Sequence, residues 1–80
     1  MMKNNSTYHS LNQVPVGCTA SVRQLNVTGP MRRRLRDIGV IEDTKIKCLQ
    51  KSPAGDPTAY LIRGAVIALR KEDSADIIVY

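Results

Sequence analysis

Residues 58–69 read TAYLIRGAVIAL, in which two apolar runs, Thr58 to Ile62 and Ala65 to Leu69, flank the dipeptide Arg63-Gly64. A two-residue connection that ends in glycine is typical of a tight β-hairpin. The spacing predicts that Ile62 faces Ala65 and that the two runs pair as antiparallel strands.

This predicted hairpin is apolar on both faces. Side chains alternate along a strand, so one face carries Tyr60, Ile62, Ile67 and Leu69, and the other carries Ala59, Leu61, Val66 and Ala68. A hairpin with one face in water is usually polar on that face. We therefore expect the second face to be covered, either by the protein's own helix or tail, or by a partner or a second copy of the chain. Leu61 and Val66 are predicted partner-binding residues.

A basic helix is predicted after the first long strand. Cys18 to Val27 alternates imperfectly with period two, which indicates a strand. Pro30 suits the first position of a helix, because its missing N–H has no partner there. The apolar stripe of this helix consists of Met31, Leu35 and Ile38. Gly39 is expected to end the helix in the left-handed conformation.

Arginines cover the rest of this helix, at Arg32, Arg33, Arg34 and Arg36. Guanidinium groups bind carboxylates and phosphates through paired hydrogen bonds, so these four are predicted partner-binding residues. The alternative is a solvated helix face. Nucleic acid is an unfavoured partner, because no tyrosine is interleaved with the arginines for base stacking.

The remaining pattern consists of short elements. The predictions are a turn at Ser10–Val16, a strand at Thr44–Leu49, a loop at Ser52–Pro57, a short turn or helical piece at Lys71–Ala75 and a strand at Ile77–Tyr80. Short strands at this spacing predict a mainly β fold, a small barrel or sandwich. Residues 1–9 are expected to be a tail and residues 10–80 the domain.

Four residues are predicted to shape turns: Gly39, Asp56, Pro57 and Gly64. Gly64 belongs to the hairpin connection. For Asp56, turn chemistry favours a carboxylate that bonds its own backbone. Gly55-Asp56-Pro57 is not a phosphate-binding loop, since it lacks the glycine-rich run followed by lysine and a hydroxyl residue.

Composition limits the function. Eighty residues with no Phe and no Trp allow one domain with an aliphatic core. The net charge of +5 permits an acidic partner, nucleic acid or an anionic membrane face. No stretch approaches the roughly 20 apolar residues of a membrane span, and Met1 to Ser6 lacks the apolar core of a signal peptide. A cytoplasmic location is expected.

No catalytic or metal-binding constellation is evident. Cys18, Cys48 and His9 are too few and too scattered for a structural zinc site. Cys18 and Cys48 could make one disulfide, but in a reducing cytosol they are expected to remain free thiols. His9 has no nearby nucleophile. The sequence therefore indicates a binding module without enzymatic activity, cofactor or metal.

Four segments in order resemble a known family. They are Leu11 to Gly17, MRRRLRDIGV at Met31–Val40, SPAGDPTAYLIRG at Ser52–Gly64, and IALRKEDSADIIV at Ile67–Val79. Together they resemble the FeoA-like domain family (ferrous iron transport protein A) over nearly the whole chain. The resemblance implies a small SH3-like β-barrel with one main helix after the first long strand and short helical turns.

The resemblance also implies a function. It suggests a cytoplasmic accessory protein of ferrous iron uptake, a protein-interaction module that regulates the FeoB-type membrane permease, whose soluble part is a GTP-binding domain. The same domain type occurs at the C-terminus of metal-dependent repressors. The alternative is therefore a stand-alone relative of that regulatory domain, with a metal-sensing or interdomain-binding role.

Two departures from the family concern Glu42-Asp43, where relatives often have Pro-Gly, and the hairpin positions Leu61 and Val66, which are often polar in relatives. Asp visits the left-handed region at some cost relative to Gly. The apolar pair supports an interface on the hairpin of this chain.

Overall fold

The predicted hairpin is present in the computed structural model, which describes residues 8–80. Strands β3 (Thr58–Ile62) and β4 (Ala65–Leu69) pair in the expected register, with Ile62 opposite Ala65. The connecting residues Arg63 and Gly64 both have positive φ, 48° and 83°. This conformation of both turn residues matches the twist of the flanking strands and closes the hairpin tightly.

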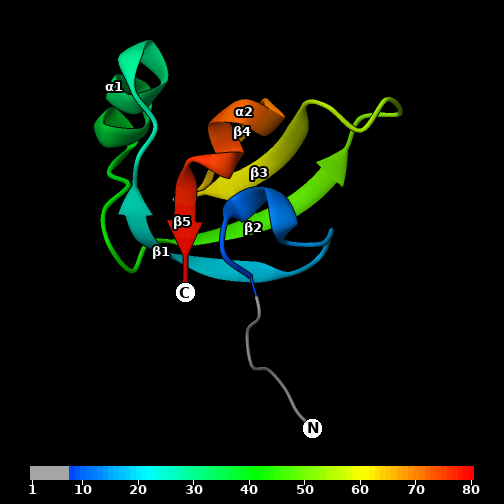
Figure 1. Cartoon of the computed structure of the whole chain (residues 1–80), viewed down its shortest axis with the longest axis horizontal. Helices are drawn as coiled ribbons and strands as arrows, with labels where there is room; N and C mark the ends of the chain where they lie inside the picture. Colours follow the sequence, from blue (N-terminus) through cyan, green and yellow to red (C-terminus); the bar gives the residue numbers. More distant parts are fainter. Residues whose placement is uncertain (1–7) are drawn as a thin grey trace, which may run out of the picture.

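The other elements confirm a mainly β fold with one main helix after the first long strand (Figure 1). They are a 3₁₀ turn η1 (Leu11–Gln13), β1 (Thr19–Leu25), α1 (Gly29–Ile38), β2 (Lys45–Lys51), α2 (Lys71–Ala75) and β5 (Ile77–Val79). All strands belong to one antiparallel sheet in the order β4-β3-β2-β1-β5. The helix begins one residue before the predicted Pro30, and Gly39 ends it with φ 101°.

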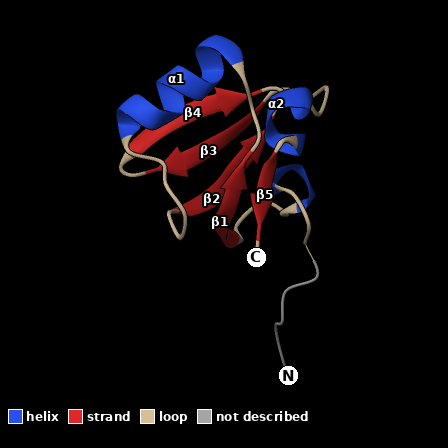
Figure 2. Cartoon of the chain, turned by 60° about the vertical axis from the view of Figure 1, so that its left-hand side comes forward, coloured by secondary structure: helices blue, strands red, loops and turns tan. Residues whose placement is uncertain are grey.

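Strand β1 connects the two halves of the sheet. Its first residues pair with β2, Thr19 opposite Lys47, and its last residues pair with β5, Leu25 opposite Ile77. The register shifts between Val22 and Gln24, and such a bulge bends a strand and increases its twist. The sheet therefore curves, and α1 and α2 lie on its concave side (Figure 2).

The core fills this concave side. Leu35 of α1 is fully buried in it, and α2 packs against η1 and β5. The buried residues of this core are aliphatic apart from Cys48 and Tyr60. They are Leu11, Val14, Ala20, Val22, Val27, Leu35, Val40, Ile46, Cys48, Tyr60, Ile62, Ile67, Leu69, Ile77 and Val79.

Two residues before the expected domain boundary at residue 10 make contacts with the fold. Tyr8 packs against the core, and the carbonyl oxygen of His9 accepts a hydrogen bond of 3.0 Å from the N–H of Val79. The His9 contact adds a backbone hydrogen bond at the edge of β5. The rest of the predicted tail, residues 1–7, lies outside the described residues. Within residues 8–80, no helix is long and apolar enough to cross a membrane.

Candidate functional site

The outer face of the β3–β4 hairpin is an exposed apolar surface. Tyr60, on the inner face, is 2% exposed, whereas Leu61 and Val66 are 37% and 64% exposed. They lie directly opposite each other, and Lys47 of β2 lies beside Leu61 in the same row of the sheet. Helix α1 contributes Leu35 to the core on the concave side, so among the described residues neither helix covers this outer face.

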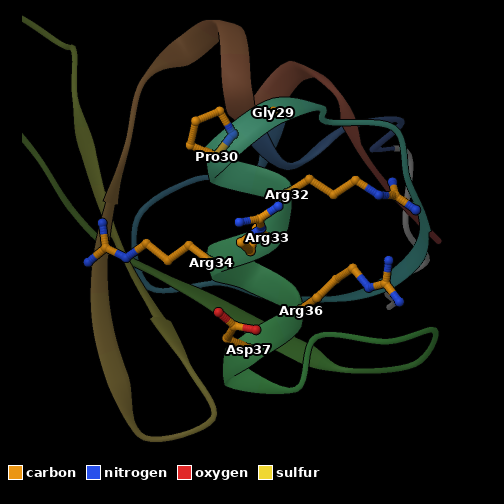
Figure 3. A pocket seen from close by; sticks show the side chains of 7 residues that line it. All are labelled: Gly29, Pro30, Arg32, Arg33, Arg34, Arg36 and Asp37. Carbon is orange, nitrogen blue, oxygen red and sulfur yellow. The ribbon is translucent and has the colours of Figure 1, made fainter.

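The arginines of α1 form the second surface. Arg33, Arg34 and Arg36 are exposed, and together with Arg32, Gly29, Pro30 and Asp37 they line an open depression around the helix. Figure 3 shows Arg34 extending to one side of α1 and Arg36 to the other, with Arg33 between them. Asp37 is the single acidic residue of this lining. Three guanidinium groups so arranged suit carboxylates or phosphates.

Arg32 differs from the other three. Its Nη1 donates hydrogen bonds to the carbonyl oxygens of Leu25 and Val27, at 2.8 and 3.4 Å. These carbonyls belong to the last residue of β1 and to a residue just beyond it. Arg32 is only half-exposed and joins α1 to the end of β1, so its guanidinium has a structural role. The exposed cationic surface therefore consists of Arg33, Arg34 and Arg36.

The hairpin turn contacts the end of the basic helix. A Cβ placed on Gly39 would lie 3.0 Å from Nε of Arg63, so the Arg63 side chain runs over the end of α1. A cation at a helix C-terminus interacts favourably with the helix dipole. This contact places the β3–β4 turn beside the last residue of the basic helix. The contact brings the end of α1 close to the hairpin turn, while Leu61 and Val66 lie on the face of the hairpin that points away from the core.

The predicted role of Asp56 is wrong in one respect. Its carboxylate does not bond its own turn; Oδ1 instead accepts a hydrogen bond of 2.8 Å from the backbone N–H of Lys71, at the start of α2. Helix α2 has no local side-chain cap, since its N-cap residue is Arg70. Asp56 therefore supplies the missing cap from a distant loop. The Asp56–Pro57 peptide bond is cis.

The other departure in sequence, Glu42-Asp43, has a clear backbone consequence. Asp43 adopts φ 74°, the conformation that a glycine would take at least cost. Its N–H donates a hydrogen bond of 2.7 Å to the carbonyl oxygen of Val22, and the N–H of Val22 bonds the carbonyl of Thr44 at 2.9 Å. These two bonds tie the turn to β1 and offset the strain.

The sequence left open whether Cys18 and Cys48 lie close together, and the structure places them side by side. The cysteines are 30 positions apart in the chain, but the β1–β2 pairing brings them opposite each other, with a backbone hydrogen bond of 2.9 Å from Cys48 N–H to Cys18 C=O. The register Thr19 opposite Lys47 continues directly to this pair. His9 lies elsewhere, beside β5. Over residues 8–80, no three His, Cys, Asp or Glu side chains gather in a way that could hold a metal ion.

The buried polar groups of the core are structural. Burial raises the pKa of the Tyr60 hydroxyl, while hydrogen bonds with Ser74 and Thr58 oppose this effect. The Ser74 hydroxyl also donates to the carbonyl of Lys71 at 3.2 Å. Tyr60 thereby joins β3 to α2.

Comparison with known proteins identifies relatives of the chain. The profile of the FeoA domain matches residues 9–80. The structure is similar to that of the FeoA protein from Chlorobium tepidum, with a TM-score of 0.82 and 30% identity over 89% of this chain and 68% of that one. No curated protein sequence matches the chain significantly.

Two further structures share the fold at lower identity. The zinc-complexed FeoA of Stenotrophomonas maltophilia, described as an SH3 domain protein suggested to act as an activating factor of ferrous iron transport, has a TM-score of 0.77 and 22% identity, over 91% of each chain. A manganese-dependent transcriptional repressor has a TM-score of 0.73 and 19% identity, over 95% of this chain and 42% of the repressor. The SH3-like fold and the profile match over residues 9–80 agree, and the chain belongs to the FeoA domain family.

Proposed function

We propose that this protein is a cytoplasmic accessory protein of ferrous iron uptake that binds and regulates a FeoB-type permease. The observation that carries the proposal is a FeoA domain that presents exposed arginines on α1 and an exposed apolar face on the β3–β4 hairpin. A relative suggested to activate ferrous iron transport supports the transport setting. The protein acts by binding and performs no catalysis.

The contact surface consists of Arg33, Arg34 and Arg36 on α1, with Leu61 and Val66 on the hairpin. The arginines bind carboxylates of the permease's cytoplasmic domain through paired, charge-assisted hydrogen bonds. An anionic inner leaflet next to the permease would add to the attraction. Leu61 and Val66 bury apolar area in the same contact, and burial of such side chains contributes about 25 cal/mol per Å².

Calorimetric titration of the permease's soluble GTP-binding domain tests this contact. The variants are Arg33→Glu with Arg34→Glu, and Leu61→Lys with Val66→Lys. Each pair is expected to weaken binding at least tenfold. Lys51→Glu, a charge reversal at an exposed residue near the far end of β2, is the matched control and should bind like the wild type. Wild-type protein that does not bind contradicts the partner, and binding that survives all four substitutions contradicts the contact surface.

The alternative, a metal-sensing relative of the repressor domain, has weaker support. The likeness to the manganese-dependent repressor shows a shared fold, and the described residues contain no cluster of three metal-ligating side chains. Titration with Fe²⁺, Mn²⁺ and Zn²⁺ under anaerobic conditions tests this role. Micromolar binding accompanied by altered affinity for the permease domain would favour sensing over the simple accessory role.

A further inference from the structure

Cys18 and Cys48 occupy facing positions on neighbouring antiparallel segments. The N–H of Cys48 donates to the carbonyl of Cys18 at 2.9 Å, and the N–H of Gly17 donates to the carbonyl of Cys48 at 2.7 Å. Gly17 has φ 89°. One residue more on the first segment, with glycine in the left-handed region, is the pattern of a β-bulge. The bulge ends in a directly opposed pair of cysteines.

The backbone on both sides of this pair is held in place. The N–H of Cys18 donates to the carbonyl of Pro15 at 3.1 Å, which closes a turn directly before β1. On the other side, Thr19 and Ala20 continue the ladder with Lys47 and Ile46. The distance between the two cysteines is therefore set by the hydrogen-bonded backbone rather than by a loop.

Both thiols point to the same side of the sheet. Cys48 and Ile46 lie two residues apart in β2, so their side chains point to the same face of the sheet. Both are fully buried on the concave face. Cys18 lies on the same face as the buried residues Ala20 and Val22 of β1, and it is half-buried against the core. Facing residues of an antiparallel pair have Cα atoms about 4.5–5.5 Å apart, with the larger value for hydrogen-bonded pairs. This spacing falls within the range of about 4.4–6.8 Å that a disulfide requires.

We propose that Cys18 and Cys48 form an oxidisable dithiol that hydroperoxides convert into an intramolecular disulfide. The proposal is independent of the partner proposed above, because it concerns a chemical modification of residues on the concave face. The two thiols are free in the structure. The oxidised form joins the residue before β1 to the middle of β2, and thiol reductants restore the dithiol.

The positions of the two sulfurs assign the order of the steps. Cys18 is the more exposed thiol, so its sulfur attacks the peroxide, breaks the O–O bond and becomes sulfenic acid with release of one water from hydrogen peroxide. The sulfur of Cys48 then attacks the Cys18 sulfur. The Cys18 S–O bond breaks, and the leaving hydroxide takes the Cys48 proton to form a second water. Burial raises the pKa of the Cys48 thiol, with Lys51 opposing this effect, which suits Cys48 to the resolving step rather than the first.

The test treats reduced, full-length protein with hydrogen peroxide in the absence of metal and counts thiols in denaturant. Two reactive thiols are expected before oxidation and none after it, with a mass loss of two hydrogen atoms. Proteolysis without reductant should yield one linked pair of peptides containing Cys18 and Cys48. Dithiothreitol should return both thiols. These measurements use the wild-type chain and do not depend on whether a variant folds.

Two variants test the assigned order. In Cys48→Ala, a sulfenic-acid probe such as dimedone should label Cys18, because no resolving thiol remains. In Cys18→Ser, Cys48 should stay reduced at peroxide concentrations that fully oxidise the wild type. Circular dichroism establishes that each variant folds. Disulfide-linked dimers, oxidation of Cys18 to sulfinic acid while Cys48 keeps its thiol, or two unreacted thiols in the wild type would each overturn the proposal.

Discussion

Oδ1 of Asp56 accepts a hydrogen bond of 2.8 Å from the backbone N–H of Lys71, 15 residues further along the chain. The contact joins the loop between β2 and β3 to the first turn of α2. It satisfies an N–H that a helix start otherwise leaves without an intrahelical partner. Because α2 lies beside Tyr60 through Ser74, this contact also supports the packing of β3.

Asp56→Ala is expected to destabilise the fold by about 1 kcal/mol, the usual cost of removing a helix cap. Asp56→Asn should lose less, since its amide oxygen accepts the same bond without the charge. Urea unfolding followed by circular dichroism measures both. Equal stability of Asp56→Ala and wild type would show that the capping contact contributes nothing.

Gly39→Ala is expected to destabilise the fold by about 1–2 kcal/mol, because φ 101° is strained for any residue with a Cβ. A smaller part of the cost comes from displacing Arg63, whose Nε would lie 3.0 Å from the new Cβ. The same substitution in an Arg63→Ala background separates the two terms. Most of the loss should persist in that background; complete recovery would mean that the collision with Arg63, and not φ, dominates.

Arg32→Met is expected to cost about 1–2 kcal/mol, because it removes a charged donor from the carbonyls of Leu25 and Val27. Met retains an apolar stem of similar length. Arg33→Met, on the exposed side of the same helix, is the matched control and should change stability by less than about 0.5 kcal/mol. Chemical denaturation compares them. Equal effects of the two substitutions would contradict the structural role of Arg32.

Alkaline pH is expected to destabilise the protein through Tyr60. Burial raises the pKa of its hydroxyl in the folded state, so below the ordinary tyrosine pKa of about 10 both states hold the proton and stability is unaffected. Above that pH the unfolded chain releases its proton first, and stability falls as pH rises toward the folded-state pKa. Unfolding measured from pH 8 to 11 should show this loss.

Tyr60→Phe removes the part of the alkaline loss that belongs to Tyr60. It also removes the hydrogen bonds with Ser74 and Thr58, so it should be less stable than the wild type near neutral pH. The comparison is Tyr80→Phe. The hydrogen bond that Tyr80 donates to Glu42 raises its pKa, but Tyr80 is 49% exposed whereas Tyr60 is 2% exposed. Tyr80→Phe should therefore change the pH dependence less, and the opposite order would contradict this assignment.

Local sequence patterns were sufficient to predict most of the helices and strands. The hairpin at residues 58–69 follows from two apolar runs around Arg63-Gly64, and its register is confirmed pair by pair. The helix follows from the spacing of Met31, Leu35 and Ile38 before Gly39. Both signals depend on residues within a few positions of one another, where backbone geometry leaves few alternatives. For the same reason the left-handed conformation of Gly39 at the end of the helix could be predicted.

The tertiary structure decided which of these residues meet. Arg32 and Arg33 are chemically identical and adjacent in the chain, but only the docking of α1 against the end of β1 makes Arg32 structural. Likewise, Asp56 caps a helix that begins 15 residues later, and Cys18 faces Cys48 only because β1 pairs with β2 in this register. Such contacts depend on how separate elements pack, and no local period records that packing. The sequence by itself determined a mainly β fold, its tight turns and a basic helix; the packing of that helix and the pairing of the strands decided which side chains remain available to a partner.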